Sequence, residues 1–335
     1  MNEATRYIIY GAGGIGGSIG ARLFQRGYDV VLIARGAHFR AIEEQGLRFV
    51  TPIQDVRIRM PATDHPRHVD FRDGDVVILC VKSQHTESAL TDLYAAAGDG
   101  IPVICCQNGV ANERMALRRF RRVYGMNVMV GGVHLDPGEV FNSGENPAGM
   151  LDIGRFPSGV DNLAENIAEA LTEAGFSSLP DASIMGQKYG KLVANLGNAV
   201  QPVCGDDAGE VLALLREEAA ECYRVAGIEW IDMRTFMAGR ESSSQRLRSI
   251  PGHDRPGGSS WQSIQRGTGN IETDFLNGEI VQLGRLHGKP TPANVVMQRL
   301  GNRVASEGLP IGSFPTEAVL QMIEAERARQ GLPPK

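Results

Sequence analysis

The stretch Tyr7-Ile8-Ile9-Tyr10-Gly11-Ala12-Gly13-Gly14-Ile15-Gly16 decides the fold of this chain. Its first four residues are an apolar run that predicts a strand, and the Gly-x-Gly-x-x-Gly spacing then opens a helix expected to run to about Arg26. In this context Gly11 permits a tight turn, Gly13 lets the backbone approach a pyrophosphate, and Gly16 allows close packing of helix on strand. The helix N-terminus favours anionic phosphates. The sequence therefore predicts a dinucleotide site made by Gly11, Ala12, Gly13, Gly14, Ile15 and Gly16.

The second expected strand, Asp29–Ala34, indicates which dinucleotide is bound. It ends in Arg35-Gly36, at the place where NAD-binding folds usually carry an acidic residue for the ribose hydroxyls. An arginine there suits a 2′-phosphate, and Arg40 lies near enough in sequence to help. These residues favour NADP over NAD. His38 is expected on the surface of this loop, with a position facing the adenosine as the alternative.

Two further strands place polar residues at the carboxyl edge of the expected sheet. The apolar run Asp75–Val81 reads as a buried parallel strand and is followed by Lys82. The run Pro102–Cys106 is followed by Gln107-Asn108-Gly109. Because open α/β sheets bind ligands at this edge, we expect Lys82 and Asn108 near the nicotinamide end of the cofactor. Each could also be an ordinary turn residue.

The rest of the first half is a mixture of strands and helices. We expect a β-rich excursion at Leu47–Val50 and Val56–Met60, a strand at Val123–Val130, an antiparallel pair formed by Gly138–Phe141 and Gly149–Ile153, a helix at Asp161–Gly175 and a hinge at Leu179–Asp181.

From Ala182 onward the periodicity is helical. The expected helices are Ala182–Val200, Ala208–Ala226, Ile271–His287, Thr291–Ser306 and Thr316–Gln330, with Asn270 as an N-cap. The irregular stretch Gly239–Ser260 is read as a mobile surface loop, or alternatively as a lid that carries substrate contacts. The chain is thus predicted to be an α/β dinucleotide-binding domain of the Rossmann type at residues 1–180, followed by an all-α domain at residues 181–335.

One expected helix carries a polar stripe. Lys191, Asn195 and Asn198 stand at i, i+4 and i+7, and so project within one narrow sector of a continuous α-helix. Apolar residues at Leu192 and Leu196 would give the same helix a core face. The stripe is either a substrate-reading face or an ordinary solvated face, and the neighbouring motifs must decide between these readings.

Composition narrows the function. With 335 residues, 42% of them hydrophobic, and a net charge of −5, the chain reads as a two-domain globular protein that binds neither nucleic acid nor an anionic membrane. It has no membrane-length apolar run and no secretory signal pattern, so a cytoplasmic location is expected. The cysteines form no CxxC pair, and the histidines show no ligand spacing; we expect reduced core thiols and no metal. The cysteines are Cys80, Cys105, Cys106, Cys204 and Cys222.

A nicotinamide-type fold followed by a helical domain with a Lys-x-x-x-Asn stripe resembles the ketopantoate reductase (2-dehydropantoate 2-reductase) family over nearly the whole chain. The motifs that carry the resemblance are Gly11–Gly16, Arg35-Gly36, Val81-Lys82, Gln107-Asn108-Gly109, Lys191–Asn195, Ser259-Ser260 and Glu272–Gly278. The twelve-residue step from Ser260 to Glu272 also matches the family. The resemblance implies a C-terminal domain like that of 6-phosphogluconate dehydrogenase. A homodimer is compatible with the resemblance.

The resemblance also implies roles for the residues. A hydride from NADPH would reach the 2-keto carbon of a small-molecule acid, and Lys191 would protonate the developing alkoxide. Glu272 would anchor the substrate hydroxyl or orient the lysine, and would also lie by the cofactor. Asn195, Asn198 and Ser260 would bind substrate oxygens. Asn108 would lie near both nicotinamide and substrate, and Lys82 near the cofactor. A cation is needed where negative charge develops, which supports the lysine independently.

Two departures from the family pattern bear on the substrate. The family's second asparagine stands eight residues after the lysine, where this chain has Ala199, while Asn198 stands at seven. Trp261-Gln262-Ser263-Ile264 replaces Met-Leu-Gln-Asp. Ketopantoate is the expected substrate; the alternatives are another 2-keto acid or an imine, and, from a different class of protein, a non-catalytic NADP sensor.

Overall fold

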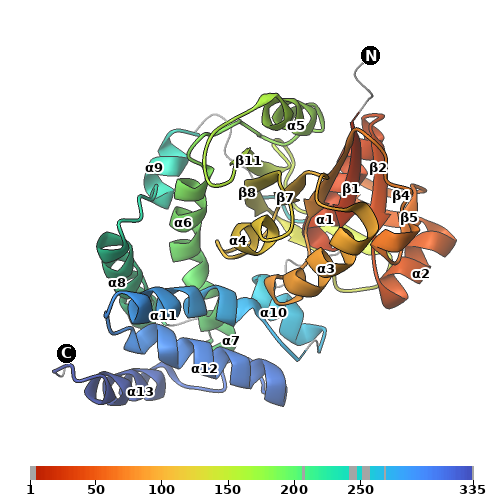
Figure 1. Ribbon diagram of the computed structural model, residues 1–335. Coiled ribbons are helices and arrows are strands. Elements are labelled where there is room, and N and C mark those ends of the chain that lie inside the picture. The colour runs from red at the N-terminus through yellow and green to blue at the C-terminus, as the bar shows by residue number, and fades with distance from the viewer. Residues whose placement is uncertain (1–4, 206–207, 241–246, 251–256, 268, 334–335) are drawn as a thin grey trace. The chain divides into compact units, whose positions relative to one another are not determined.

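The computed structural model describes residues 5–205, 208–240, 247–250, 257–267 and 269–333. The chain packs into two compact units. Figure 1 shows its helices and strands, coloured by residue number from the N-terminus to the C-terminus. Unit 1 comprises Met1–Gln107, Asn112–Lys188 and Arg234–Arg255, and unit 2 comprises Asn108–Ala111, Tyr189–Met233 and Pro256–Lys335. The division at residue 180 stays a prediction. No helix in the described part of the chain is long and apolar enough to cross a membrane.

Unit 1 is built on a seven-stranded sheet with the order β11-β8-β7-β6-β1-β2-β5. All neighbours pair in parallel except β11, which runs antiparallel to β8. The strands are β1 (Arg6–Tyr10), β2 (Asp29–Ile33), β5 (Ala62–Thr63), β6 (Asp75–Leu79), β7 (Val103–Cys105), β8 (Val123–Val130) and β11 (Gly149–Arg155). The expected strand and glycine-turn order is confirmed, and with it the α/β class of this half.

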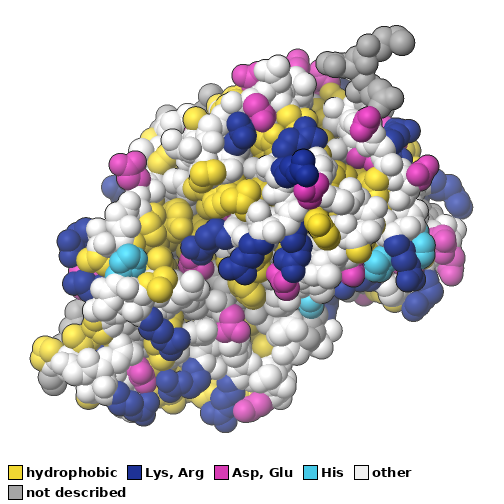
Figure 2. All heavy atoms as spheres, in the orientation of Figure 1, with side chains coloured by type: hydrophobic (Ala, Val, Ile, Leu, Met, Phe, Trp, Pro, Cys, Tyr) yellow, Lys and Arg dark blue, Asp and Glu magenta, His cyan; other side chains and the backbone are white. Residues whose placement is uncertain are grey.

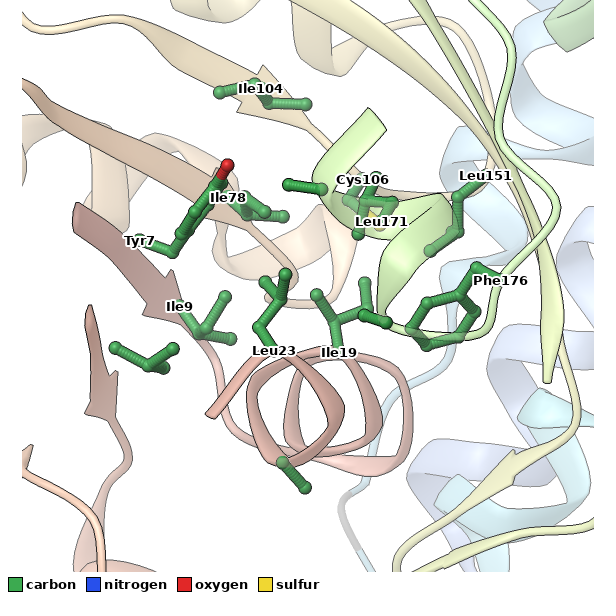
Figure 3. Packing of buried hydrophobic residues seen from close by; sticks show 14 of the residues in the cluster. Tyr7, Ile9, Ile19, Leu23, Ile78, Ile104, Cys106, Leu151, Leu171 and Phe176 are labelled. Atoms are coloured by element: carbon green, nitrogen blue, oxygen red, sulfur yellow. The ribbon is translucent and has the colours of Figure 1, made fainter. Parts of the chain in front are cut away.

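Alternating side chains of β1 enter two cores, one on each face of the sheet. Tyr7 and Ile9 pack with helices α1 and α5, whereas Ile8 and Tyr10 pack with α3 and α4. Figure 3 shows the first of these cores, with Leu23 and Ile19 of α1 pointing up from the helix next to Ile9 of β1, and with Leu171 of α5 above Ile19. The helices of unit 1 are α1 (Gly14–Gln25), α2 (Gly36–Gln45), α3 (Thr86–Ala97), α4 (Asn112–Leu117), α5 (Asn162–Glu173) and α9 (Met233–Ala238), which begins one residue before the unit boundary.

A second sheet of four strands corrects one expected pairing. Its order is β4-β3-β10-β9, from β3 (Leu47–Thr51), β4 (Gln54–Ile58), β9 (Gly132–Val133) and β10 (Glu139–Asn142). The segments Gly138–Phe141 and Gly149–Ile153 were expected to pair with each other, and that prediction is wrong. β10 pairs with β3 and β9, while β11 pairs with β8 of the main sheet. Strand identity is a local property, whereas the choice of partner depends on distant residues.

The stretch Gly239–Ser260 is described only in part, since residues 241–246 and 251–256 lie outside the described residues. Arg240 and residues 247–250 pack on the rest of unit 1, whereas residues 257–260 belong to unit 2. Arg240 forms a buried ion pair with Asp152 of β11 and donates to Ser177 Oγ at 2.9 Å. The Arg248 N–H donates to the Ser143 carbonyl at 2.9 Å. Ile250 is buried in a small apolar cluster with Val50, Val133 and Phe141. For Arg240 and residues 247–250, the prediction of a mobile surface loop is therefore wrong.

Unit 2 is helical, as expected. Its helices are the C-terminal part of α6 (Ile184–Asn195), then α7 (Val200–Cys204), α8 (Gly209–Ala226), α10 (Ser259–Gln265), α11 (Asn277–Leu286), α12 (Pro292–Glu307) and α13 (Thr316–Arg329). Helix α12 packs against α7, α8, α11 and α13, and Figure 1 shows α11, α12 and α13 in the blue end of the colour range. On the face drawn in Figure 2, basic and acidic side chains are interspersed with small apolar areas.

Candidate active site

The glycine loop of unit 1 has the geometry that a pyrophosphate needs. Gly11 adopts φ +103°, which an L side chain rarely tolerates, so the chain can turn directly out of β1. Gly13 is the N-cap of α1, and the first turn of that helix holds no acidic residue. A Cβ added to Gly13 would meet no protein atom closer than 3.9 Å. Packing therefore does not require glycine at this position, and the open space in front of the helix N-terminus suits an approaching phosphate.

The other glycines of the loop serve packing. A Cβ on Gly16 would lie 2.2 Å from the Gly11 carbonyl oxygen and 2.9 Å from Ile9. A Cβ on Gly14 would lie 2.8 Å from the backbone of Gly132 in β9. The second sheet thus lies directly against the loop, and the helix lies directly against β1. This packing fits a dinucleotide-binding loop, and the assignment of individual loop residues to the cofactor stays a prediction.

His38 is half-buried and hydrogen-bonds to the glycine loop, so it is not a plain surface residue. Its Nδ1 accepts the Gly138 N–H at 2.9 Å, so that Nε2 carries the proton and donates to the Ala12 carbonyl at 2.8 Å. The ring also packs on His134, with 4.0 Å between centroids. His38 therefore fixes the carbonyl of a loop residue.

The two basic residues predicted for the cofactor stand at strand ends. Arg35 is exposed directly after β2 and is the N-cap of α2. Arg40 is exposed on α2 itself. Lys82 is half-buried three residues after β6 and is the N-cap of the 3-10 helix η2 (Ser83–His85). An exposed guanidinium two residues after the second strand suits the 2′-phosphate assignment, which stays a prediction.

In unit 2, the structure joins two of the predicted site residues directly. The half-buried Lys191 ammonium donates to Asn108 Oδ1 at 2.7 Å. Asn108 comes three residues after the end of β7, and Gly109 beside it adopts φ +78°. A Cβ on Gly109 would lie 2.9 Å from the Phe275 carbonyl, so the Asn108-Gly109 turn packs tightly on the segment that carries Glu272.

The polar stripe does not lie on one continuous α-helix. Helix α6 ends at Asn195 and is followed by a 3-10 helix η3 (Leu196–Ala199), which corrects the expected helix Ala182–Val200. Summing about 100° per residue before the change and about 120° after it places Asn198 about 40° from Lys191 around the axis. Lys191 and Asn198 thus still share a face, although the α-helical spacing was the wrong reason. Ala199, at the family's asparagine position, is 2% exposed.

Asn195 carries a buried oxygen without a partner. Its Oδ1 accepts no hydrogen bond from the described residues. A buried unsatisfied acceptor is costly and calls for an explanation. A substrate hydroxyl is one donor that would satisfy this oxygen.

Glu272 lies in a short 3-10 helix, η5 (Glu272–Phe275), and not in the first turn of a long α-helix. Ile271, not Asn270, is its N-cap, and α11 begins only at Asn277. The Glu272 side chain belongs to a residue that is 5% exposed. Ser260, 4% exposed, stands in α10, which packs against η3 and α7. Trp261 beside it is half-buried. The elements of unit 2 therefore gather Asn108, Lys191, Asn195, Asn198, Ser260 and Glu272 within one helical unit.

A buried polar chain supports η3. Asn277 Nδ2 is 3.5 Å from the Leu196 carbonyl and donates to Asn294 Oδ1 at 3.1 Å. Asn294 donates in turn to Glu218, whose carboxylate also accepts the N–H groups of Ala293 and Asn294 at 2.7 and 2.9 Å. Burial raises the pKa of Glu218, and these hydrogen bonds oppose that shift.

Sequence reasoning missed a second lysine of α6. Lys188 is 3% exposed and pairs with Glu113 of α4, which is 0% exposed, at 2.7 Å within unit 1. A usable signal was present. Lys188 stands four residues after Ile184 and four before Leu192, both fully buried, so helical spacing marks it as an inward-facing residue. The charge of the side chain concealed this, because lysines are rarely buried unless paired.

Comparison with known proteins agrees with the two-part organisation. The family model for ketopantoate reductase PanE/ApbA matches residues 7–158, and the model for its C-terminal part matches residues 183–304. The 2-dehydropantoate 2-reductase of Archaeoglobus fulgidus is 29% identical over 91% of this chain and 99% of that protein. The enzyme of the same name from Pyrococcus horikoshii is 28% identical over 87% of this chain and 95% of that protein.

Solved structures agree as well. A ketopantoate reductase of this family from Ralstonia eutropha JMP134 superposes with a TM-score of 0.74 at 28% identity, covering 91% of this chain and 99% of that one. D-mandelate dehydrogenase, solved with NADH and anilino(oxo)acetate, superposes with a TM-score of 0.77 at 22% identity, covering 91% and 99%; this match shows the fold alone. With two family models that together span most of its length, the chain belongs to the ketopantoate reductase family, whose members are nicotinamide-dependent oxidoreductases.

Proposed function

We propose that this protein reduces a 2-keto acid to the 2-hydroxy acid with NADPH, and that 2-dehydropantoate is its substrate. Membership of the family makes it an enzyme and sets aside the sensor alternative. The observation that carries the site assignment is the 2.7 Å hydrogen bond from Lys191 to Asn108. It places a cation beside a carboxamide in the unit that also holds Asn195, Ser260 and Glu272.

Each residue then has a task that its chemistry suits. Bound NADPH supplies the hydride. Lys191 holds a proton at Nζ and gives it to the substrate oxygen on which negative charge develops. Asn108 fixes the direction of that Nζ by accepting one of its protons. Glu272 accepts a hydrogen bond from the substrate hydroxyl or orients Lys191, and it also contributes to binding the cofactor.

The remaining polar residues bind and orient substrate or cofactor. The buried Asn195 oxygen, Asn198 and the Ser260 hydroxyl bind substrate oxygens, which keeps the reacting carbon in place. Gly11, Ala12, Gly13, Gly14, Ile15 and Gly16 hold the pyrophosphate through backbone N–H groups and the helix N-terminus. Arg35 binds the 2′-phosphate, and Lys82 lies by the cofactor.

The substrate assignment is tested with a panel of 2-keto acids that carry or lack the 4-hydroxyl group of 2-dehydropantoate, assayed by the loss of NADPH absorbance. We expect the hydroxylated acid to have the higher kcat/KM within each pair. Equal values would mean that Asn198 and Trp261 have changed the hydroxyl pocket and that another 2-keto acid, or an imine, is the substrate. Absence of turnover with every member would refute the proposed function.

The cell location and the partners belong to the same proposal. We propose a cytoplasmic enzyme that acts on a small acid and binds no nucleic acid. The net charge of −5 disfavours binding to the negatively charged nucleic acids. Size-exclusion chromatography with light scattering tests whether the protein is a homodimer.

A further inference from the structure

The Lys188 ammonium is buried beside the carboxyl end of β7 and the middle of the neighbouring strand β8. Its Nζ donates to the carbonyls of Gln107 at 2.9 Å, Met126 at 3.1 Å and Cys105 at 3.3 Å. Glu113 Oε1 lies 2.7 Å away, and the Glu113 carboxylate has no hydrogen-bond partner among the described residues apart from this ion pair. The charge of each side chain is thus balanced by the other, while the lysine protons are directed at backbone carbonyls.

Two of these carbonyls, those of Cys105 and Gln107, belong to the segment that leads into the proposed site, and the third, that of Met126, belongs to β8. Cys105 ends β7, and Gln107 is the residue before Asn108. The Gln107 side chain extends the same network, because its amide donates to the Val81 carbonyl and to Thr86 Oγ1, both at 2.8 Å. Val81 is the residue before Lys82. The network therefore fixes the backbone immediately before two of the predicted site residues.

We infer that Lys188 is a positioning residue for the reaction, and that Glu113 holds it in place. Lys188 fixes the Gln107 carbonyl, and thereby the direction in which Asn108 presents Oδ1 to Lys191. This inference rests on the proposed function of Lys191. Lys188 and Lys191 are three residues apart on α6, so one helix contacts the successive residues Gln107 and Asn108 through two different lysines.

Energetics support positioning over simple stabilisation. Replacing a buried ion pair by apolar side chains of similar volume is often neutral or stabilising, whereas removing one partner is strongly destabilising. A pair kept only for stability would gain little from its charges. One ammonium that binds the Cys105 and Gln107 carbonyls and also the Met126 carbonyl of β8, in contrast, fixes the end of β7 against its neighbouring strand. A displacement of about 1 Å in a site can cost about 10²-fold in rate.

The test is the double variant Lys188→Met/Glu113→Gln, which removes both charges and leaves the three carbonyls without their donor. We expect kcat to fall about 10- to 100-fold, with an NADPH Kd close to that of the parent. The melting temperature should fall because the three carbonyls lose their donor, while the variant stays folded at the assay temperature. The matched control is Arg240→Met/Asp152→Asn, which removes another buried ion pair of unit 1 away from residues 105–113. It should leave kcat unchanged.

A second comparison separates the carbonyl contacts from the charge. Glu113→Gln alone keeps the Lys188 hydrogen bonds, so it should lower the melting temperature and keep kcat within about 3-fold of the parent. Parental kcat in the Lys188→Met/Glu113→Gln variant, or an equal fall in the Arg240→Met/Asp152→Asn control, overturns the inference. If this double variant and a second apolar pair, Lys188→Leu/Glu113→Met, both fail to fold, the pair is a folding determinant and the inference is likewise overturned.

A readout independent of turnover distinguishes this inference from the proposed function. Backbone hydrogen exchange of residues 107–111 should be faster in the Lys188→Met/Glu113→Gln variant than in the control. If the parent reduces no 2-keto acid, the proposed function fails, and exchange still decides whether Lys188 fixes the turn. Unchanged exchange there contradicts the positioning role.

Discussion

The glycine loop of unit 1 (Gly11–Gly16) and the Lys191 cluster of unit 2 (Asn108, Lys191, Asn195, Asn198, Ser260 and Glu272) are the two proposed sites, and they are built by opposite means. The loop works through what is missing: Gly13 has no side chain, and the nearest protein atom to its absent Cβ is 3.9 Å away. The cluster works through what is present, a lysine cation hydrogen-bonded to Asn108 at 2.7 Å. A backbone site is therefore damaged by adding an atom, and a side-chain site by removing one.

The largest effect is expected from Lys191→Ala in the side-chain site. Loss of the general acid should lower kcat by about 10²-fold or more, since Lys191 is the one cationic side chain among the predicted site residues of unit 2. NADPH affinity, measured by fluorescence titration, should stay within about 2-fold of the parent because the glycine loop is untouched. Turnover equal to that of the parent would remove Lys191 from the mechanism.

Adding one methyl group tests the backbone site. Gly13→Ala should fold normally but raise the NADPH Kd at least about 10-fold, about 1.4 kcal/mol, because the new Cβ occupies the space meant for a phosphate. Gly258→Ala is the matched control, since Gly258 is also a helix N-cap in extended backbone with open space at its Cβ position. Isothermal titration calorimetry of both variants decides the matter. Equal affinities would show that Gly13 faces no ligand.

Arg35→Ala sharpens the comparison by removing a side chain from the backbone-built site. A charge-assisted hydrogen bond is worth about 1.5–3 kcal/mol, so NADPH binding should weaken about 10-fold or more. NADH, which lacks the 2′-phosphate, should lose much less. Arg40→Ala is the neighbouring control and is expected to have a smaller effect. Equal losses for both cofactors would refute the 2′-phosphate assignment.

The smallest effect concerns the chain of polar groups behind the side-chain site. Burial raises the pKa of Glu218 above its ordinary value of 4.5. Between pH 4.5 and the raised pKa, the folded state therefore binds more protons than the unfolded state. This group's contribution to the free energy of unfolding therefore falls as pH rises from 4.5 through the raised value. Glu218→Gln should flatten that part of the profile in urea titrations at several pH values. An unchanged slope relative to the parent would mean that Glu218 does not titrate there.

The same contrast explains how far the sequence could be followed. The sequence predicts a separate role for each of Gly11, Gly13 and Gly16, because few physical causes require a glycine at a given position. The structure confirms the close packing predicted at Gly16. Asn198 was placed by α-helical arithmetic that no longer applies after Asn195. The change to a 3-10 helix depends on packing and on Asn277, about 80 residues away, and no local pattern reveals it.

Two other errors have the same origin. The partner of β10 is β3, about 90 residues earlier, and strand propensity contains no information about such pairing. Lys188 sat on an apolar stripe, but its inward direction became intelligible only with Glu113 and the β7 carbonyls in view. Local chemistry was predictable, whereas contacts made across the chain were not.

The docking of Arg240, Arg248 and Ile250 on unit 1 has a consequence for synthesis of the protein. A fragment ending at Lys188 would leave the Asp152 carboxylate, 1% exposed, without its guanidinium partner. On the ribosome the α/β unit cannot be completed when its last strand emerges, but only about 100 residues later, when Ile250 has left the exit tunnel. Nascent chains stalled before and after that point should therefore differ in protease resistance.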